Sequence, residues 1–199
     1  LPIGAVFGVA MIFTLVYNAL VPKYGLKKLC IFGATWGAGG FVLCYFIGGE
    51  LITAMIGFVV VGIGLAALLI TTGAIIADTM DYDEIRTGKR REATYSGVEA
   101  LITKPAISIA NWLFLTVLAA YGFDQNTTNQ SPRAENGIMV GIFLIAALLF
   151  GCLALVMTKY PLDGPQWDAE KQRLAHIHVE KKKKYLEYLK EKKSKNPTN

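Results

Sequence analysis

The sequence predicts an all-α protein, a polytopic bundle of membrane-spanning helices. Of its 199 residues, 53% are hydrophobic and only 18% are charged. Its mean hydropathy is +0.42, and the few charges are unevenly distributed. A bilayer core of about 30 Å needs about 20 consecutive apolar residues of helix, and five stretches reach that length. The expected spans are residues 1–21, 29–49, 51–77, 95–121 and 137–158.

A soluble protein with buried helices is the alternative explanation of these apolar stretches. Each helix would then have to be apolar on all of its faces, which is typical only of helices at the centre of a large core. Five such helices cannot be covered by the remainder of a 199-residue chain. The run lengths therefore favour an integral membrane protein.

The joints between the spans alternate in charge. "PKYGLKK" and "DYDEIRTGKRRE" are rich in Lys and Arg, whereas "GGE" has neither and "YGFDQNTTNQSPRAEN" has only Arg133. Lys and Arg concentrate on the cytoplasmic side of membrane proteins. We therefore expect a multi-pass protein of the plasma (inner) membrane, with the first residue outside and the C-terminal tail in the cytoplasm. The expected division is a transmembrane part over 1–160 and a basic, partly helical tail over 161–199.

The tail has apolar residues at loosely helical spacing and a basic block at Lys181–Lys184. It is either an interfacial helix attracted to anionic lipid or a solvated cytoplasmic segment. His176 and His178 have no metal-binding partners nearby in the sequence, and we expect them at the surface. The helically spaced apolar residues are Trp167, Leu174, Ile177, Tyr185 and Leu189.

Lys104 is a positive charge within the fourth span. It lies nine residues beyond Tyr95, which is about 13 Å along a helix, close to the middle of the bilayer. A charge at that depth costs at least about 2.5–3.5 kcal/mol. Ser108 and Asn111 share its helical stripe, and the adjacent Pro105 frees a backbone carbonyl and favours a bend. The sequence therefore predicts that this stripe faces a cavity; a structural lysine neutralised inside the bundle is the alternative.

The segment before this span, residues 77–95, is expected to be a loop that segregates its charges. Its acids come first and its bases follow, an arrangement that can form charge-assisted hydrogen bonds to another charged surface or remain solvated. The acids Asp78, Asp81 and Asp83 also suggest a Mg²⁺-dependent transferase acting on a diphosphate. Against an enzyme, bases follow the acids at once and the sequence has no second acidic cluster.

The pattern A-D-x-x-D-Y-x-E-x-x-T-G-x-R-x-E over 77–92, followed by Lys104, resembles the glycoside–pentoside–hexuronide:cation symporters. This is the melibiose permease group of the major facilitator superfamily. "PKYGLKK" and "TKYPLDGPQW" resemble other segments of the family, so the resemblance covers the whole chain. It corresponds to helices eight to twelve of twelve. The matched positions are Asp78, Asp81, Tyr82, Glu84, Thr87, Gly88, Arg90, Glu92 and Lys104.

The resemblance implies cation-coupled transport, driven by Na⁺ or H⁺, of a sugar or related solute by alternating access. Its expected partners are the lipid bilayer, the solute and an N-terminal half of the same chain that holds the cation site; no nucleic acid, cofactor or bound metal is expected. It implies solute-facing positions at Glu99, Ala100 and Thr103, within the turn that precedes Lys104. The expected substrate-binding residues are Lys104, Thr103, Glu99, Ser108 and Asn111, and the expected cytoplasmic gate network is Asp78, Asp81, Glu84, Arg90 and Glu92.

A carrier of a lipid-like or other non-sugar solute remains the alternative within the same family. Leu69 lies where some sugar-transporting members have an aromatic ring, which stacks on a sugar as leucine cannot. Glu99 is an acid where a neutral polar group is expected. Because the chain opens inside an apolar run without an initiator methionine, we expect it to be a piece of a longer protein.

Overall fold

The computed structural model describes residues 2–127 and 129–195, and all the regular structure in these ranges is helical. Five helical stretches are long and apolar enough to cross a membrane, which confirms the predicted all-α membrane bundle. In chain order the elements are α1 (Pro2–Tyr24), α2 (Leu26–Ile47), α3 (Leu51–Thr87), α4 (Glu92–Ala120), α5 (Pro132–Met139), the π-helical turn η1 (Val140–Leu144), α6 (Ile145–Thr158) and α7 (Pro165–Lys195).

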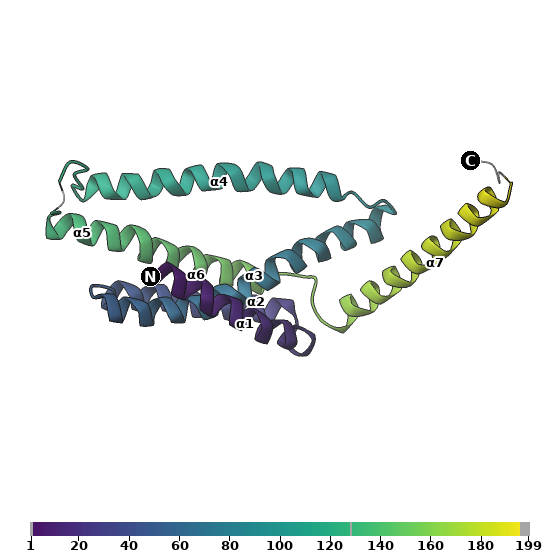
Figure 1. Ribbon diagram of the computed structural model, residues 1–199, viewed down its shortest axis with the longest axis horizontal. Coiled ribbons are helices and arrows are strands. Elements are labelled where there is room, and N and C mark those ends of the chain that lie inside the picture. The colour runs from purple at the N-terminus through teal and green to yellow at the C-terminus, as the bar shows by residue number, and fades with distance from the viewer. Residues whose placement is uncertain (1, 128, 196–199) are drawn as a thin grey trace.

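Helices α1, α2, α3 and α6 pack side by side into a bundle, in which α2 contacts α1, α3 and α6 (Figure 1). Small residues allow the close approach of α2 and α3. A Cβ atom placed on Gly33 would lie 2.5 Å from the Cβ of Ala67, and one on Gly64 would lie 2.6 Å from the backbone nitrogen of Gly37. Helices in lipid associate largely through such close backbone contacts, so these glycines hold the bundle together.

Helix α3 is longer than the predicted span. The expected loop over 77–95 is instead helical up to Thr87, because its acids, threonines and bases do not interrupt a helix. Gly88 ends the helix in the left-handed region, with φ +70°, and its N–H donates to the carbonyl oxygen of Glu84 at 2.8 Å. The 37 residues of α3 span about 55 Å. Since the bilayer core measures about 30 Å, the final turns after residue 77 extend beyond it.

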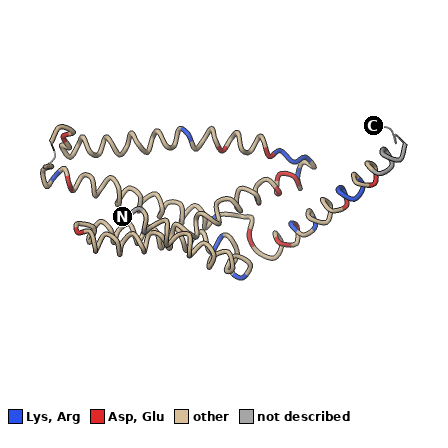
Figure 2. The backbone as a smooth tube through the Cα atoms, in the orientation of Figure 1, with Lys and Arg blue, Asp and Glu red and all other residues tan. Residues whose placement is uncertain are grey.

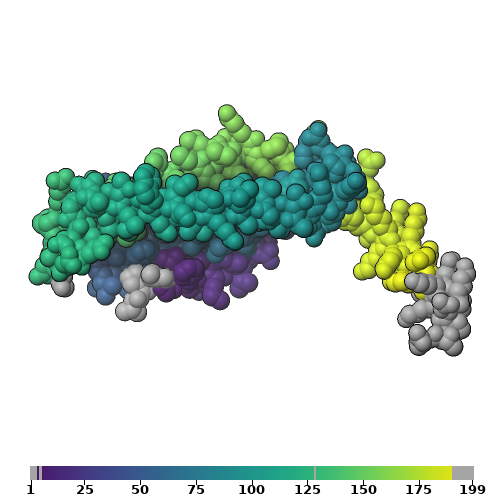
Figure 3. Space-filling model, turned by 90° about the horizontal axis from the view of Figure 1, so that it is seen from above, coloured from purple at the N-terminus to yellow at the C-terminus, as the bar shows by residue number. Residues whose placement is uncertain are grey.

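Helix α4 lies apart from this bundle and runs without a break through Pro105 (Figure 1). Its packing contacts are concentrated near its C-terminal end, against α5 and η1. A Cβ on Gly141 would lie 2.8 Å from the ring of Phe114, and Gly137 packs against the ring of Tyr121. Figure 3 shows α4 stretched along one side of the molecule, with its outer face uncovered.

The last membrane stretch begins at Pro132, five residues before the predicted span. Ser131 caps α5 by accepting a hydrogen bond from the backbone nitrogen of Ala134 at 3.2 Å, and Pro132 takes a first-turn position that needs no N–H. The π-helical turn η1 joins α5 to α6 without a break. Residues 132–158 therefore form one continuous span.

The α1–α2 turn, the α3–α4 joint and the link to α7 lie at the same end of the molecule (Figure 1). Most of the charged residues gather at this end and along α7 (Figure 2). The membrane-spanning stretches are nearly free of charge, as the sequence predicts. The charged end carries the expected gate residues, and α4 carries the expected solute-binding residues.

Candidate functional site

The end of α3 presents a set of acids to the rest of the charged end. Asp78, Asp81 and Glu84 follow one another at three-residue intervals on the helix, so neighbouring carboxylates lie about one turn apart. Asp78 and Glu84 are 6% and 5% exposed, and they are the two buried charged residues of the described chain. Buried carboxylates need partners, and the structure supplies these from two directions.

The first set of partners for these acids comes from the turn between α3 and α4. Gly88 reverses the chain, so that Arg90 NH1 lies 3.3 Å from both Asp81 Oδ1 and Glu84 Oε2. Arg90 also bonds to Glu92 through its Nε. The structure therefore brings together four of the five expected gate residues, with three acids around the guanidinium group of Arg90.

Arg91 makes a separate pair with Asp83. Its Nε and NH2 atoms lie 2.9 and 2.6 Å from the two carboxylate oxygens of that residue. This is the bidentate arrangement that an arginine fork favours. Sequence reasoning grouped Asp83 with possible magnesium ligands, and the structure instead places it against an arginine. Within the described ranges, no group of three or more His, Cys, Asp or Glu residues is placed to hold a metal ion.

The second set of partners for these acids comes from the tail helix α7. Trp167 donates its indole N–H to Asp78 Oδ2 at 2.9 Å, and Lys171 Nζ lies 3.4 Å from the same carboxylate. About two to three turns beyond Lys171, His178 Nε2 lies 2.8 Å from Glu84 Oε1, and Lys181 Nζ lies 3.8 Å from the same oxygen. The fifth expected gate residue, Asp78, is thus held by the tail and not by Arg90.

His176 is exposed and the side chain of His178 is 36% exposed, so both lie at the surface as expected, but His178 also bonds to a buried carboxylate, which the sequence does not predict. Sequence reasoning missed Trp167, Lys171 and His178 as partners of the gate acids. The signal that was available is their spacing: Trp167, Lys171, Leu174, His178 and Lys181 follow at intervals of three or four and so share one helical face. The structure buries Trp167 and Leu174 at 7% and 6% exposure.

These contacts keep Glu84 ionised. Burial on its own raises the pKa of Glu84, but the hydrogen bonds and charges of His178 and Arg90 outweigh it, and the pKa falls below its ordinary value. At neutral pH Glu84 is therefore a carboxylate that binds the tail helix and the α3–α4 turn at the same time.

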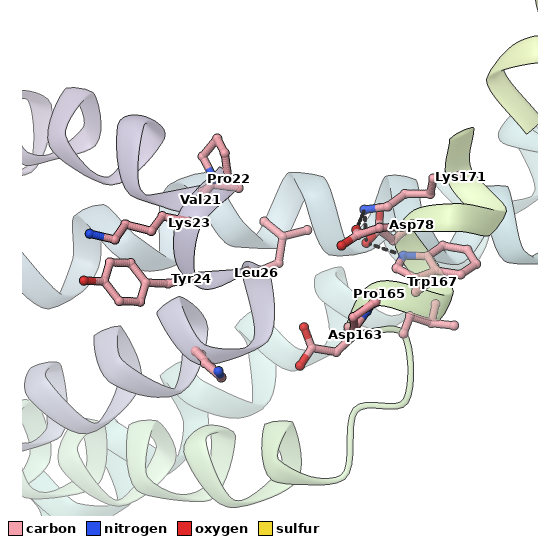
Figure 4. Close-up of a pocket in the computed structure, with 15 residues that line it drawn as sticks. Val21, Pro22, Lys23, Tyr24, Leu26, Asp78, Asp163, Pro165, Trp167 and Lys171 are labelled. Atoms are coloured by element: carbon pink, nitrogen blue, oxygen red, sulfur yellow. Dashed lines mark hydrogen bonds and ion pairs between the residues drawn. The ribbon is translucent and has the colours of Figure 1, made fainter. Parts of the chain in front are cut away.

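A cavity of about 340 Å³ lies beside the Asp78 contact (Figure 4). The α1–α2 turn lines one side of it, with Tyr24 and Leu26, and the start of α7 lines the other, with Pro165 and Trp167. Figure 4 shows the dashed contacts from Trp167 and Lys171 converging on Asp78. The link to α7 is also tied to α2, because Lys27 Nζ donates to the carbonyl oxygen of Tyr160 at 2.9 Å.

The five expected solute-binding residues all lie on α4, and all are exposed in the described chain. Lys104 is the thirteenth residue of this 29-residue helix, and no described carboxylate lies within 4.0 Å of its ammonium group. Ser108 donates weakly to the Lys104 carbonyl oxygen at 3.5 Å. Glu99 and Thr103 occupy a neighbouring face of the helix. The structure thus places these side chains along an uncovered surface of α4.

Comparison with known proteins identifies the family. The family model described as MFS/sugar transport protein matches residues 2–164. The chain belongs to this family. Membership in a family of sugar transport proteins agrees with the resemblance of residues 77–104. Because this family consists of transporters, the alternative of a Mg²⁺-dependent transferase is set aside. Together with its five long apolar helices, this makes the chain part of an integral membrane transport protein.

Three relatives illustrate the range of the family. The chain is 24% identical over 149 residues to a glucuronide carrier protein homolog of Escherichia coli K12. It is 28% identical over 150 residues to a candidate sulfoquinovose importer of the same organism. It is 29% identical over 130 residues to a candidate 2,3-dihydroxypropane-1-sulfonate exporter of Salmonella typhimurium LT2.

The matched regions comprise 74%, 75% and 65% of this chain, in the order given above. They comprise only 32%, 32% and 28% of the relatives. The chain thus spans about a third of the length of the curated relatives it matches.

Proposed function

We propose that the chain forms part of a cation-coupled secondary transporter that moves a sugar or related solute across the plasma (inner) membrane by alternating access. In such transporters the solute binds near the middle of the bilayer, between two helical bundles that rock against each other. The described chain supplies one bundle, and an N-terminal half supplies the other together with the Na⁺ or H⁺ site. Its first residue is outside and its tail is in the cytoplasm.

The observation that carries this proposal is the position of Lys104. It lies midway along a helix long enough to cross the bilayer, and the described chain offers it no carboxylate. An ammonium group left in lipid at that depth would cost several kcal/mol. A water-filled cavity between two bundles removes this cost, and the ammonium is then free to bind a solute group.

The surroundings of Lys104 fit a solute-binding wall. Ser108 and Asn111 fall within about 60° of it on the helical wheel, and both are exposed. Glu99 and Thr103 add an acid and a hydroxyl on the adjoining face. A sugar needs several hydrogen-bond donors and acceptors at once, and this stripe offers both kinds.

The relatives point to the charge of the solute. A glucuronide, sulfoquinovose and 2,3-dihydroxypropane-1-sulfonate each carry an acid group, and these are the solutes in the relatives' names. An ammonium and a carboxylate or sulfonate form a charge-assisted contact, which is stronger than a neutral hydrogen bond. We therefore infer that the solute is a sugar derivative with an acid group, and that Lys104 binds this group.

The gate residues at the end of α3 fit the same mechanism. Arg90 holds Asp81, Glu84 and Glu92 together at the cytoplasmic end. With Arg90 and Glu92 themselves about half exposed, the cluster is open to contact with a second bundle. In the outward-facing state it would close the cytoplasmic side, and its separation would open that side.

The test is uptake by proteoliposomes containing the full-length protein. An imposed Na⁺ or pH gradient should drive accumulation of a radiolabelled uronic acid glycoside, and an ionophore that collapses the gradient should abolish it. A neutral glycoside of the same size is the matched control and should accumulate less. Uptake that only equilibrates the solute, whatever gradient is imposed, would contradict cation coupling. Transport of a labelled lipid in place of the glycoside would support the lipid-like alternative.

A further inference from the structure

We propose that the tail helix α7 is a strap on the cytoplasmic gate, with Trp167, Lys171 and His178 as positioning residues that hold Asp78 and Glu84. On this view the tail, and not the opposite bundle, is the partner of these two acids. The proposal rests on the proposed function for the existence of a gate. The docking of α7 onto α3 can be measured without any transport.

Burial divides the gate acids into two that the tail covers and two that are more exposed. Asp78 and Glu84 are almost wholly covered, and the contacts of Trp167, Lys171, His178 and Lys181 occupy their carboxylate oxygens. The side chain of Asp81 is 25% exposed, and that of Glu92 is 59% exposed. A second bundle approaching this end would therefore meet Asp81, Arg90 and Glu92 before it met the two tail-held acids.

The packing of α7 suits an element that can dock and release. Trp167 and Leu174 are its buried apolar anchors, and the ring of Trp167 lies edge-on to that of Tyr82 with 6.2 Å between centroids. A cavity of about 340 Å³ borders the Asp78 contact, and another of about 290 Å³ borders Glu84, Leu174 and Lys181. The tail is thus held by polar contacts at Asp78 and at Glu84, each bordered by a cavity, and not by a continuous apolar interface.

Electrostatics explain what the strap does. Asp78, Asp81 and Glu84 follow at three-residue spacing on α3, and like charges at such spacing repel. Arg90 compensates Asp81 and Glu84, whereas Asp78 has Lys171 as its cation. Loss of the α7 side chains that bind Asp78, while the helix still covers it, leaves a buried carboxylate without a partner, which is strongly destabilising. The end of α3 would then loosen and carry the α3–α4 turn, with its gate residues, out of position.

The experiment compares tail variants in the full-length protein by two readouts. The variants are Trp167→Phe, which keeps the ring but removes the indole donor, and its combination with His178→Ala. The control is Tyr188→Phe, at an exposed position further along α7. Spin labels at Lys89→Cys and Lys182→Cys, in a cysteine-free background, report the docking of α7. A separate thiol at Ser108→Cys reports cytoplasmic access to the cavity by its rate of modification.

In the double variant we expect the interspin distances to broaden and the modification rate to rise by about fivefold or more, the lower end of typical couplings between sites. The control should change neither readout. Unchanged distances in the double variant would show that these contacts do not hold the tail. Broadened distances with an unchanged modification rate would show that the tail docks without acting on the gate. If the proposed transport function alone is wrong, the distances still respond to the variants.

If the double variant fails to fold, Asp78→Asn provides the second test. The amide oxygen still accepts the Trp167 N–H, while the charge that attracts Lys171 is gone. We expect narrow interspin distances in Asp78→Asn and broadened ones in Asp78→Leu, which has no acceptor. Equal distances in the two variants would overturn the assignment of Trp167.

Discussion

Trp167 donates its indole N–H to Asp78 Oδ2 at 2.9 Å, joining residues 89 positions apart in the sequence. This contact connects the tail to the last turns of α3, and Lys171 and His178 extend the connection on the same helical face. The charged end of the described chain is therefore built from three segments: the end of α3, the α3–α4 turn and α7.

The first prediction concerns Asp81. Asp81→Asn removes one of the two acids that Arg90 NH1 contacts at 3.3 Å. Because this pair is partly exposed, it is worth about 0.2–1 kcal/mol. We expect a modest rise in cytoplasmic modification of a cavity thiol at Ser108→Cys. An unchanged rate, with normal expression, would count against a gating role for Asp81.

The second prediction compares two neighbouring arginines. Arg90 contacts Asp81, Glu84 and Glu92, whereas Arg91 pairs with Asp83. Arg90→Gln removes the charge that compensates a buried carboxylate, so it should increase cavity-thiol modification more than Arg91→Gln does. The two variants are matched in chemistry and differ in their partners. A larger effect from Arg91→Gln would mean that the gate is centred on Asp83.

The third prediction tests the close approach of α2 and α3. Gly33→Ala places a methyl group 2.5 Å from the Cβ of Ala67, whereas Gly39→Ala on the same helix meets nothing within 4 Å. Overpacking of this kind costs about 1–3 kcal/mol. We expect Gly33→Ala to lower the melting temperature in detergent and Gly39→Ala to leave it unchanged or slightly raised. Equal melting temperatures would show that the helices are less closely packed than the structure indicates.

The membrane-spanning helices could be predicted because their signal is local. Charge-free runs such as 51–77 and 136–158 specify long apolar helices without any knowledge of their neighbours. The family could also be predicted, since the pattern over 77–92 is local and long. The end of α3 at Thr87 differs from the predicted end at residue 77, because the change in composition at Asp78 does not mark a change in structure. Gly88, after a threonine, was the better indication of the helix end.

The tail contacts could not be predicted in the same way. A histidine at position 178 gives no sign of the carboxylate it meets 94 residues earlier in the chain. The helical spacing of Trp167 and Leu174 does predict a buried face, but not what covers it. Ile177 and Tyr185, which were grouped with them, are exposed in the structure. Long-range polar contacts depend on how helices pack, and a single sequence does not contain that information.

The role of Lys104 in solute binding stays a prediction, and its test is the most direct test of the proposed function. In full-length protein reconstituted in proteoliposomes, Lys104→Ala should abolish gradient-driven accumulation of a uronic acid glycoside while expression and melting temperature stay near those of the wild type. Lys104→Arg keeps the charge and should retain part of the uptake. The measurement is the initial rate of uptake at fixed solute and cation gradients. Near-normal uptake by Lys104→Ala would contradict the proposed function.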